Sequence, residues 1–259
     1  MKLYKYIPPE RVDILENEKI VFTPPGRFKD PFEWRPELAG ITARALLKDT
    51  VRQHPKELIP GAHKMSARQL KIARRTLLKN ANERGILEKT RESFSKTVAT
   101  RADKDFGVLC LSATENENLM WYHYADGHRG VVIEFDSEQQ EFRSLGRLWR
   151  IEYVNTQPVY DHRVHNIDFF RFKPKYLEFE KEYRIIRPLK ECVPVNGQDE
   201  CMLYFWPLPR VCVQAVYFGH RISDGFRGRI LRALQNASAR KFDSVPGKEN
   251  YKLSFQEFK

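Results

Sequence analysis

Apolar, β-branched segments follow one another along this chain with no helix-forming segment between them. GVVIEF and IEYV, at residues 130–135 and 151–154, are such neighbours, and so are EYRII at 182–186 and VCVQAVYF at 211–218. Parallel strands need a long crossover between them, whereas antiparallel strands can follow each other directly. The order of segments therefore predicts an α+β fold with a mixed, mostly antiparallel sheet, and it excludes a doubly wound α/β fold.

The other expected elements surround this set. We expect further strands at residues 3–7, 20–25, 108–112 and 251–255, and helices at 10–17, 118–125, 169–177 and 224–240. Residues 35–104 differ from the rest because they are rich in helix-forming residues and poor in β-branched runs. The sequence predicts one α+β domain, 1–259, that contains 35–104 as a basic helical insertion.

Most of the positive charge lies in this insertion. Residues 41–104 carry sixteen basic and six acidic side chains, and the whole chain has a net charge of +11. Near Ser66, a predicted N-cap, basic residues recur every three or four positions and so share one face of a helix. This basic stripe consists of Lys64, Arg68, Lys71, Arg75 and Lys79, and no carboxylate occurs between Leu58 and Asn82. The stripe is either a solvated face or the contact surface of an anionic partner. Nucleic acid is the partner that we expect for 41–104, since Lys and Arg neutralise phosphates.

Several classes of protein are excluded by what the sequence lacks. No apolar run approaches the roughly 20 residues that span a bilayer, and the opening MKLYKYIPPER has no apolar signal-peptide core. The motifs GxGxxG, GxxxxGK[ST], HExxH and GxSxG are missing. We therefore expect a cytoplasmic protein without membrane contact, and neither a Rossmann-type nor a P-loop enzyme.

The cysteines and histidines do not form an obvious metal site. Cys110, Cys192, Cys201 and Cys212 include no CxxC pair, so we expect reduced thiols. His162 and His165 are spaced as two ligands beside Asp161, but the sequence indicates no third ligand. We expect no metal there.

Two clusters combine aromatic and polar residues. In IVFTPPGRFKDPFE (20–33), Asp30 and Glu33 lie in a loop after a strand, where an Asx-turn is the simplest interpretation. In LCLSATENENLMWYHYADGHRGVVIEF (109–135), four aromatic residues run from Trp121 to Tyr124. Four consecutive rings cannot all face one core, although Trp121 and Tyr124 fit one at i,i+3. The segment therefore predicts a cleft for a planar ligand.

A third cluster, LEFEKEYRII at 177–186, alternates acidic with other residues. At strand spacing, Glu178, Glu180 and Glu182 fall on one face of a strand. Adjacent carboxylates repel, so we expect a shielded site to raise the pKa of one of them. A ladder of glutamates on a surface strand is the alternative interpretation.

Together these clusters resemble a family of bacterial and phage proteins whose shared domain has no assigned function. The family pattern runs LYKY, F-N-D-P-F-E, a strand-ending Ser followed by N-L-M-W-x-H-Y-A-x-x-H-x-G, and E-x-E-Y-R. This chain matches the pattern at 3–6, 28–33, Ser112, 118–130 and 180–184, with Lys29 in place of the usual Asn. The match covers most of the chain except the basic helices.

The order of elements is also similar to that of the ADP-ribosyltransferase superfamily, especially its DNA-modifying bacterial toxins. The likeness rests on Leu3-Tyr4-Lys5, Ile14-Leu15, residues 20–23 and Glu180-Lys181-Glu182, with Lys5 where the superfamily uses His or Arg. It implies a split sheet and an NAD-dependent transferase that modifies nucleic acid or a nucleic-acid-associated target. It also implies a toxin or anti-phage effector, with an antitoxin or defence-system partner.

The resemblance implies roles for particular residues. Glu182 would stabilise the oxocarbenium-like ribose, and Glu180 would activate the acceptor as a general base. Seven residues would bind NAD: Lys5, Tyr6, Ser112, Trp121, Tyr122, His123 and Arg184. Among them, Lys5 would anchor the diphosphate or ribose, and Tyr122 or Trp121 would stack on nicotinamide. These roles require the first strand, the aromatic segment and the glutamates to share one cavity.

Two other functions fit the same sequence. A metal-dependent nuclease would bind Mg²⁺ through carboxylates drawn from Asp30, Glu33, Glu134, Asp136 and Glu180. A non-catalytic binding module of a defence system would use the basic stripe to hold nucleic acid or protein. Nicotinamide release without metal identifies the transferase, metal-dependent degradation identifies the nuclease, and binding without turnover identifies the module.

Overall fold

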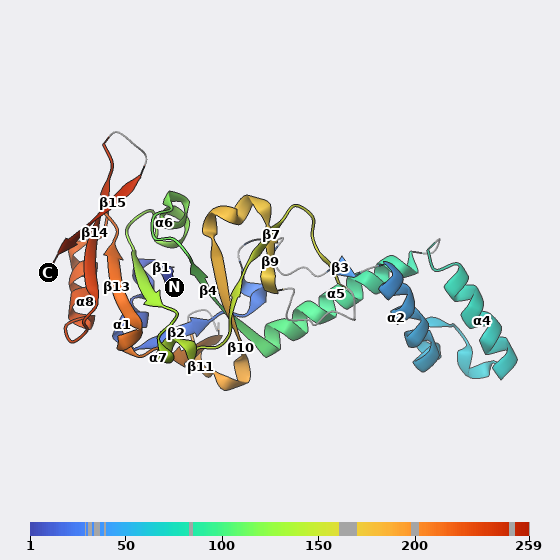
Figure 1. The fold of residues 1–259 in the computed structure, drawn as a ribbon. Coiled ribbons are helices and arrows are strands. Elements are labelled where there is room, and N and C mark those ends of the chain that lie inside the picture. Colours follow the sequence, from blue (N-terminus) through green and yellow to red (C-terminus); the bar gives the residue numbers. More distant parts are fainter. Residues whose placement is uncertain are drawn as a thin grey trace.

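An eight-stranded sheet forms the centre of the molecule (Figure 1). The computed structural model describes residues 1–28, 30, 33, 37–38, 40–82, 85–160, 170–197, 202–248 and 252–258. Across the sheet the strands are β15 (Leu253–Phe258), β14 (Arg240–Pro246), β13 (Val213–Phe218), β5 (Val131–Asp136), β1 (Lys2–Ile7), β4 (Phe106–Ser112), β10 (Glu182–Pro188) and β6 (Leu148–Arg150). Neighbours are antiparallel except for β13 and β14, which are parallel. The predicted α+β fold with a mixed, mostly antiparallel sheet is confirmed.

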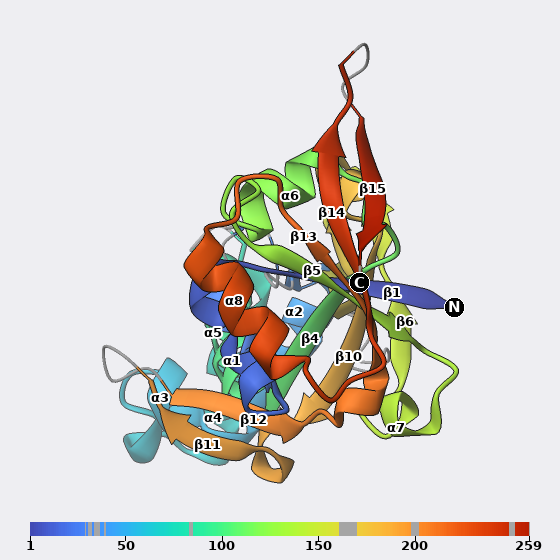
Figure 2. The same ribbon diagram turned by 90° about the vertical axis from the view of Figure 1, so that its left-hand side faces the viewer.

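The two faces of the sheet bury different residues. Because side chains alternate along a strand, Leu3 and Ile7 of β1 join one core, while Tyr4 and Tyr6 join another on the opposite face. Helices α1 (Asp13–Glu16) and α8 (Asp224–Ala233) lie side by side on the first face (Figure 2), and α6 (Asn118–Tyr124) covers the second.

Smaller sheets complete the body. A three-stranded sheet has the order β11 (Val193–Asn196), β12 (Met202–Pro207) and β2 (Lys19–Phe22), and the short helix α7 (Gln140–Arg143) precedes β6. Two parallel pairs are β3 (Glu37–Leu38) with β8 (Val159–Tyr160), and β7 (Glu152–Val154) with β9 (Phe172–Pro174). Among the described residues, no helix combines the length and the apolarity needed to cross a membrane.

Four helices between β3 and β4 form an arm that projects from the sheet (Figure 1). They are α2 (Gly40–Gln53), α3 (Pro55–Leu58), α4 (Ala67–Lys79) and α5 (Ile86–Asp105). The arm has a small core of its own, in which Leu47, Val51 and Leu77 are buried. Ser66 caps α4 as predicted, because its hydroxyl accepts from Gln69 N at 3.3 Å while Gln69 Oε1 accepts from Ser66 N at 2.8 Å.

Some expected elements differ from those observed. The helix predicted at 169–177 is wrong: Phe172–Pro174 is β9, and Lys175–Glu180 forms a 3₁₀ turn. Pro174 explains the difference, since proline has no N–H to donate within a helix and disfavours a helical conformation in the residue before it. The last long helix ends at Ala233 rather than near Arg240, and β14 follows.

Candidate functional site

A cavity of about 610 Å³ opens beside the central strands β1 and β4. Within the described chain, these two strands pair at one position only, Tyr4 with Ser112. Further along β4, Val108 pairs instead with Thr23, which follows β2. Tyr4, Thr23 and Ser112 all line the cavity, which therefore lies where the ladder between β1 and β4 is interrupted.

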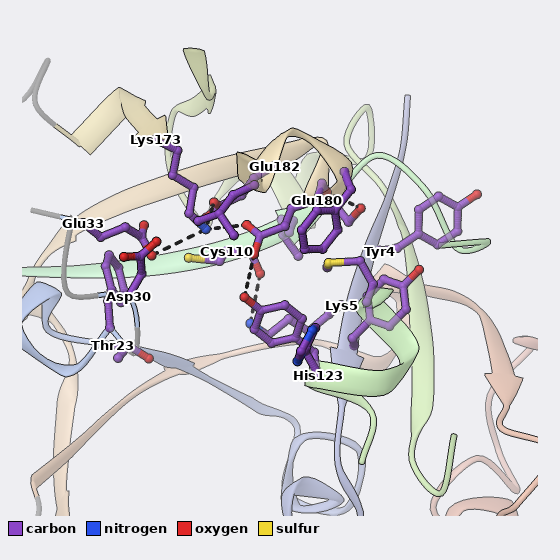
Figure 3. Close-up of a pocket in the computed structure, with 18 of the residues that line it drawn as sticks. Tyr4, Lys5, Thr23, Asp30, Glu33, Cys110, His123, Lys173, Glu180 and Glu182 are labelled. Atoms are coloured by element: carbon purple, nitrogen blue, oxygen red, sulfur yellow. Dashed lines mark hydrogen bonds and ion pairs between the residues drawn. The ribbon is translucent and has the colours of Figure 1, made fainter. Parts of the chain in front are cut away.

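Three distant parts of the sequence meet in this cavity (Figure 3). Lys5 comes from β1, His123 and Tyr124 come from α6, and Glu180 and Glu182 come from the turn before β10 and from its first residue. The convergence on which the sequence interpretation depends is therefore present in the structure.

Glu182 is a buried carboxylate held by two cations. It pairs across the sheet with Ser112, and Arg184 follows on the same face of β10. Glu182 Oε1 accepts from Arg184 Nε at 2.7 Å, and Oε2 lies 2.8 Å from Lys173 Nζ. Burial favours the neutral acid, but the charges of Arg184 and Lys173 outweigh it and hold the pKa of Glu182 well below its ordinary value. The two neighbouring cations thus favour the ionised form of Glu182.

Glu180 lies in the same site, but the backbone that places it there is not the strand that the sequence predicted. The expected glutamate ladder is wrong, because residues 175–180 form a 3₁₀ turn and Lys181 is left-handed, with φ of 45°. Glu178 therefore points to solvent, where it pairs with Lys175, whereas only 3% of Glu180 is exposed. Glu180 Oε1 accepts from the Tyr124 hydroxyl at 2.6 Å, and Oε2 pairs with Lys173.

Lys173 joins the carboxylates into one network (Figure 3). Besides Glu180 and Glu182, its ammonium lies 3.5 Å from Glu33 Oε2, and Glu33 also pairs with Arg184. Burial would lower the pKa of Lys173, but the carboxylates, led by Glu182 and Glu33, raise it above its ordinary value. Burial raises the pKa of Glu33. Three buried carboxylates thus share two cations, and the network holds one more acidic than basic group.

Lys5 and Ser112 occupy the floor near the strand interruption. Lys5 Nζ donates to the carbonyl of Cys110 at 2.9 Å, a side-chain bond across the place where β1 and β4 do not pair. Burial lowers the pKa of Lys5. The Ser112 hydroxyl donates to the Glu180 carbonyl at 2.7 Å and accepts from Thr114 N at 3.1 Å. Ser112 therefore positions the turn that carries Glu180.

Two predicted NAD-binding residues, Trp121 and Tyr122, lie away from the cavity surface. Trp121 is fully buried beside Tyr6 and His128, and its indole donates to the Glu115 carbonyl at 2.8 Å. Tyr122 is 66% exposed. On a helix, residues i, i+3 and i+4 share a face, so Met120, His123 and Tyr124 line the cavity in their place.

The other two predicted residues serve as supports. Arg184 is buried behind Glu182 and also donates to the Phe170 carbonyl at 3.0 Å. Tyr6 lines the cavity, and its hydroxyl donates to the Thr114 carbonyl at 2.9 Å.

Of the carboxylates proposed for a nuclease, Asp30, Glu33 and Glu180 line the cavity, whereas Glu134 and Asp136 lie outside it. Glu134 lies on β5, where it accepts from Tyr217 at 2.5 Å and pairs with Lys2, and Asp136 pairs with the N-terminus. Within the described ranges, no group of three or more His, Cys, Asp or Glu residues is arranged to hold a metal ion. His162 and His165 lie outside the described residues, as does Cys201, and the other three cysteines are free thiols.

The basic stripe lies on the arm. Arg68, Lys71, Arg75 and Lys79 are exposed on α4, whereas Lys64 is exposed in the 3₁₀ turn that precedes it. The stripe forms no salt bridge with any other residue that the structure describes.

Sequence reasoning missed Lys173 and assigned no transferase role to Glu33 or Tyr124. Lys173 falls in the segment wrongly predicted as helical, so its pairing with the glutamates gave no local signal. Tyr124 was detectable, since helical spacing puts it beside His123 on the face that carries Met120.

Comparisons of the chain with protein-family models, curated proteins and solved structures find no match.

Proposed function

We propose that this cavity cleaves the nicotinamide–ribose bond of NAD and transfers ADP-ribose to an acceptor. The observation that carries the proposal is the pair of buried carboxylates, Glu180 and Glu182, which belong to one cavity and share the cation of Lys173. A carboxylate held beside a reacting carbon stabilises a transition state that carries positive charge there. Cleavage of this bond generates that charge on the ribose.

The bond between the ribose C1′ and the nicotinamide nitrogen breaks, and its electron pair leaves with nicotinamide. Positive charge develops on C1′, where the Glu182 carboxylate stabilises it. An acceptor oxygen or nitrogen forms the new bond to C1′ and gives its proton to Glu180, which acts as general base. Lys173 positions both carboxylates and Arg184 positions Glu182, and neither cation contacts the reacting atoms.

The lining of the cavity suits the parts of NAD. Its volume lies within the range of roughly 300–1,000 Å³ typical of ligand sites. The rings of Phe28, Tyr124 and Phe179 provide apolar surface for a planar base, and the carboxylates accept hydrogen bonds from ribose hydroxyls. Arg27 is exposed on the lining and offers a cation to the diphosphate. The interruption between β1 and β4 supports the split-sheet interpretation.

Incubation of the purified protein with NAD in EDTA tests the proposal, with nicotinamide measured by chromatography and mass spectrometry. We expect release by the wild type, and a loss of at least about a hundredfold in Glu180→Gln. The matched control is Glu178→Gln, which changes a glutamate two residues away that is exposed and outside the cavity. Its rate should equal that of the wild type.

Loss of folding is separated from loss of chemistry by recording an unfolding curve for each variant. A folded Glu180→Gln protein that releases nicotinamide at the wild-type rate contradicts the proposal, and so does a wild type that releases none. Cleavage of DNA or RNA only with added Mg²⁺ would instead support a nuclease.

A further inference from the structure

The exposed face of α4 carries cations without nearby acids. Arg68, Lys71, Arg75 and Lys79 are all exposed, and the helix Ala67–Lys79 contains no carboxylate. Like charges three and four residues apart repel one another and destabilise an isolated helix. On the body, by contrast, exposed arginines such as Arg143 and Arg229 are paired with glutamates. The stripe thus has no acidic residue on its own helix to offset its charge.

We propose that this face of the arm docks on the phosphate backbone of a double-stranded nucleic acid. At about 1.5 Å per residue, the charges from Arg68 to Lys79 extend over roughly 16 Å. A duplex presents one negative charge per about 1.7 Å of its axis, so a straight row of cations faces a continuous row of phosphates. A repeating polyanion fits this row better than a single acidic group does.

The packing of α4 argues against a membrane surface as the partner. Helices that lie on membranes insert an apolar face between lipids. In α4 the apolar face packs inside the protein, because Leu77 is buried and Leu70 and Ala73 pack in the core of the arm. Ile72, which is 57% exposed, is the one large apolar side chain that the described part of α4 leaves on the surface.

The composition of the arm argues against a single-stranded partner. Proteins that bind single strands stack the bases on exposed aromatic rings. Phe94 is the sole Phe, Tyr or Trp of the sequence between residues 40 and 105, and it packs against Ala43 inside the arm. The stripe therefore contacts the backbone and does not read bases.

The length of the arm sets the size of the partner. Helix α5 has 20 residues, so the arm extends over about 30 Å from the start of β4. At about 3.4 Å per base pair, a partner that contacts both α4 and the cavity needs roughly ten base pairs or more. That such a duplex is also the acceptor of ADP-ribose rests on the proposed function, whereas docking on the arm does not.

Binding to a fluorescein-labelled DNA duplex of about 30 base pairs, measured by anisotropy across about 50–200 mM salt, tests the docking. The stripe variant is Arg68→Ala/Lys71→Ala/Arg75→Ala, in which alanine preserves the helix. We expect its affinity to fall at least about tenfold at low salt and its salt slope to decrease by about 3, one for each phosphate contact removed.

The matched control removes the same charge from the body. Lys19→Ala/Lys190→Ala/Lys248→Ala changes three exposed lysines outside the arm, and it should bind within about twofold of the wild type. Equal losses in the two triple variants, or an unchanged slope in the stripe variant, overturn the proposal. So does tighter binding to a single strand, to poly-glutamate of equal charge or to phosphatidylserine vesicles than to the duplex.

A final comparison separates this inference from the proposed function. Glu180→Gln should bind the duplex like the wild type, because Glu180 lies in the cavity and not on the arm. Nicotinamide release without duplex binding refutes the docking alone, and duplex binding without nicotinamide release refutes the chemistry alone. Mass spectrometry of the duplex after incubation with NAD tests whether it accepts ADP-ribose.

Discussion

Glu182 is a buried carboxylate of the cavity whose charge is held by its neighbours. Only 4% of it is exposed, and both carboxylate oxygens accept from cationic groups. Removing one partner of a buried ion pair leaves the others uncompensated, which typically costs about 3–5 kcal/mol. The residue that we assign to catalysis is therefore also important for stability.

We predict that Glu182→Gln lowers the free energy of unfolding by about 3–5 kcal/mol at neutral pH. The substitution should also make the free energy of unfolding depend less on pH in the acid range. The unfolded carboxyl titrates near 4.5, and the folded pKa lies well below that value. Between these two pKa values the unfolded chain binds a proton that the folded chain does not, so the wild type loses stability as the pH falls below about 4.5.

Urea unfolding at neutral pH and near pH 3 measures both effects. The control Glu178→Gln removes an exposed carboxylate and should stay within about 0.5 kcal/mol of the wild type. Parallel acid profiles for wild type and Glu182→Gln would show that the charge of Glu182 is not held by its neighbours.

Tyr124 positions the proposed general base. Its hydroxyl donates to Glu180 at 2.6 Å, and burial followed by the charge of Glu180 raises its pKa, so it remains a donor. We predict that Tyr124→Phe lowers kcat for nicotinamide release about tenfold with KM unchanged, since about 1.4 kcal/mol corresponds to a factor of ten. A rise in KM at constant kcat would assign Tyr124 to NAD binding instead.

At the scale of elements, the turn from α6 into β5 fixes the side of the cavity that carries His123 and Tyr124. Gly130 precedes β5 and lies so close to β1 that an added Cβ would overlap the Ile7 carbonyl oxygen. We predict that Gly130→Ala destabilises the protein by several kcal/mol, because backbone on both sides must move.

Gly225 provides the matched control for Gly130. It lies in α8, and an added Cβ there has no atom within 4 Å. Gly225→Ala should stabilise the protein by about 1 kcal/mol, since alanine favours the helix more than glycine does. Thermal unfolding compares the two variants. A Gly130→Ala protein with the same melting temperature as the wild type would mean that β1 and β5 separate easily.

The elements that the sequence predicted well have periodic patterns that tertiary contacts do not override. The strand at 130–135 is apolar except for Glu134 because both its faces are buried, and α4 has a cap and an apolar face. The site was only partly predictable. Glu180 and Glu182 were identified, but the left-handed Lys181 that turns both toward Lys173 has no sequence signal, since lysine rarely adopts that conformation.

At the scale of the whole molecule, the two proposals place their ligands on separate parts. The proposed NAD site lies among β1, β4, α6 and β10, and the proposed duplex site lies on α4. Binding at one place stabilises local structure against opening, which hydrogen exchange detects.

We predict that NAD slows amide exchange in β4 and β10 and that a duplex slows it in α4. In the stripe variant, NAD should still slow exchange in β4 and β10, but a duplex should no longer slow it in α4. In Glu180→Gln, a duplex should still slow exchange in α4. Protection of α4 by NAD alone would indicate that the arm folds over the cavity, contrary to the separate placement proposed here.

Helix α5 continues into β4 without an intervening residue, since Asp105 ends the helix and Phe106 begins the strand. That strand runs to Ser112, which supports the turn that carries Glu180. No linker separates the helix from the strand, and Gly26 N donates to Asp103 Oδ1 at 2.8 Å near the end of the helix, so the base of the arm has a defined direction relative to the cavity. A nucleic acid bound by α4 would consequently be modified at a constant distance from the bound segment. That distance could be read from the position of ADP-ribose in the product.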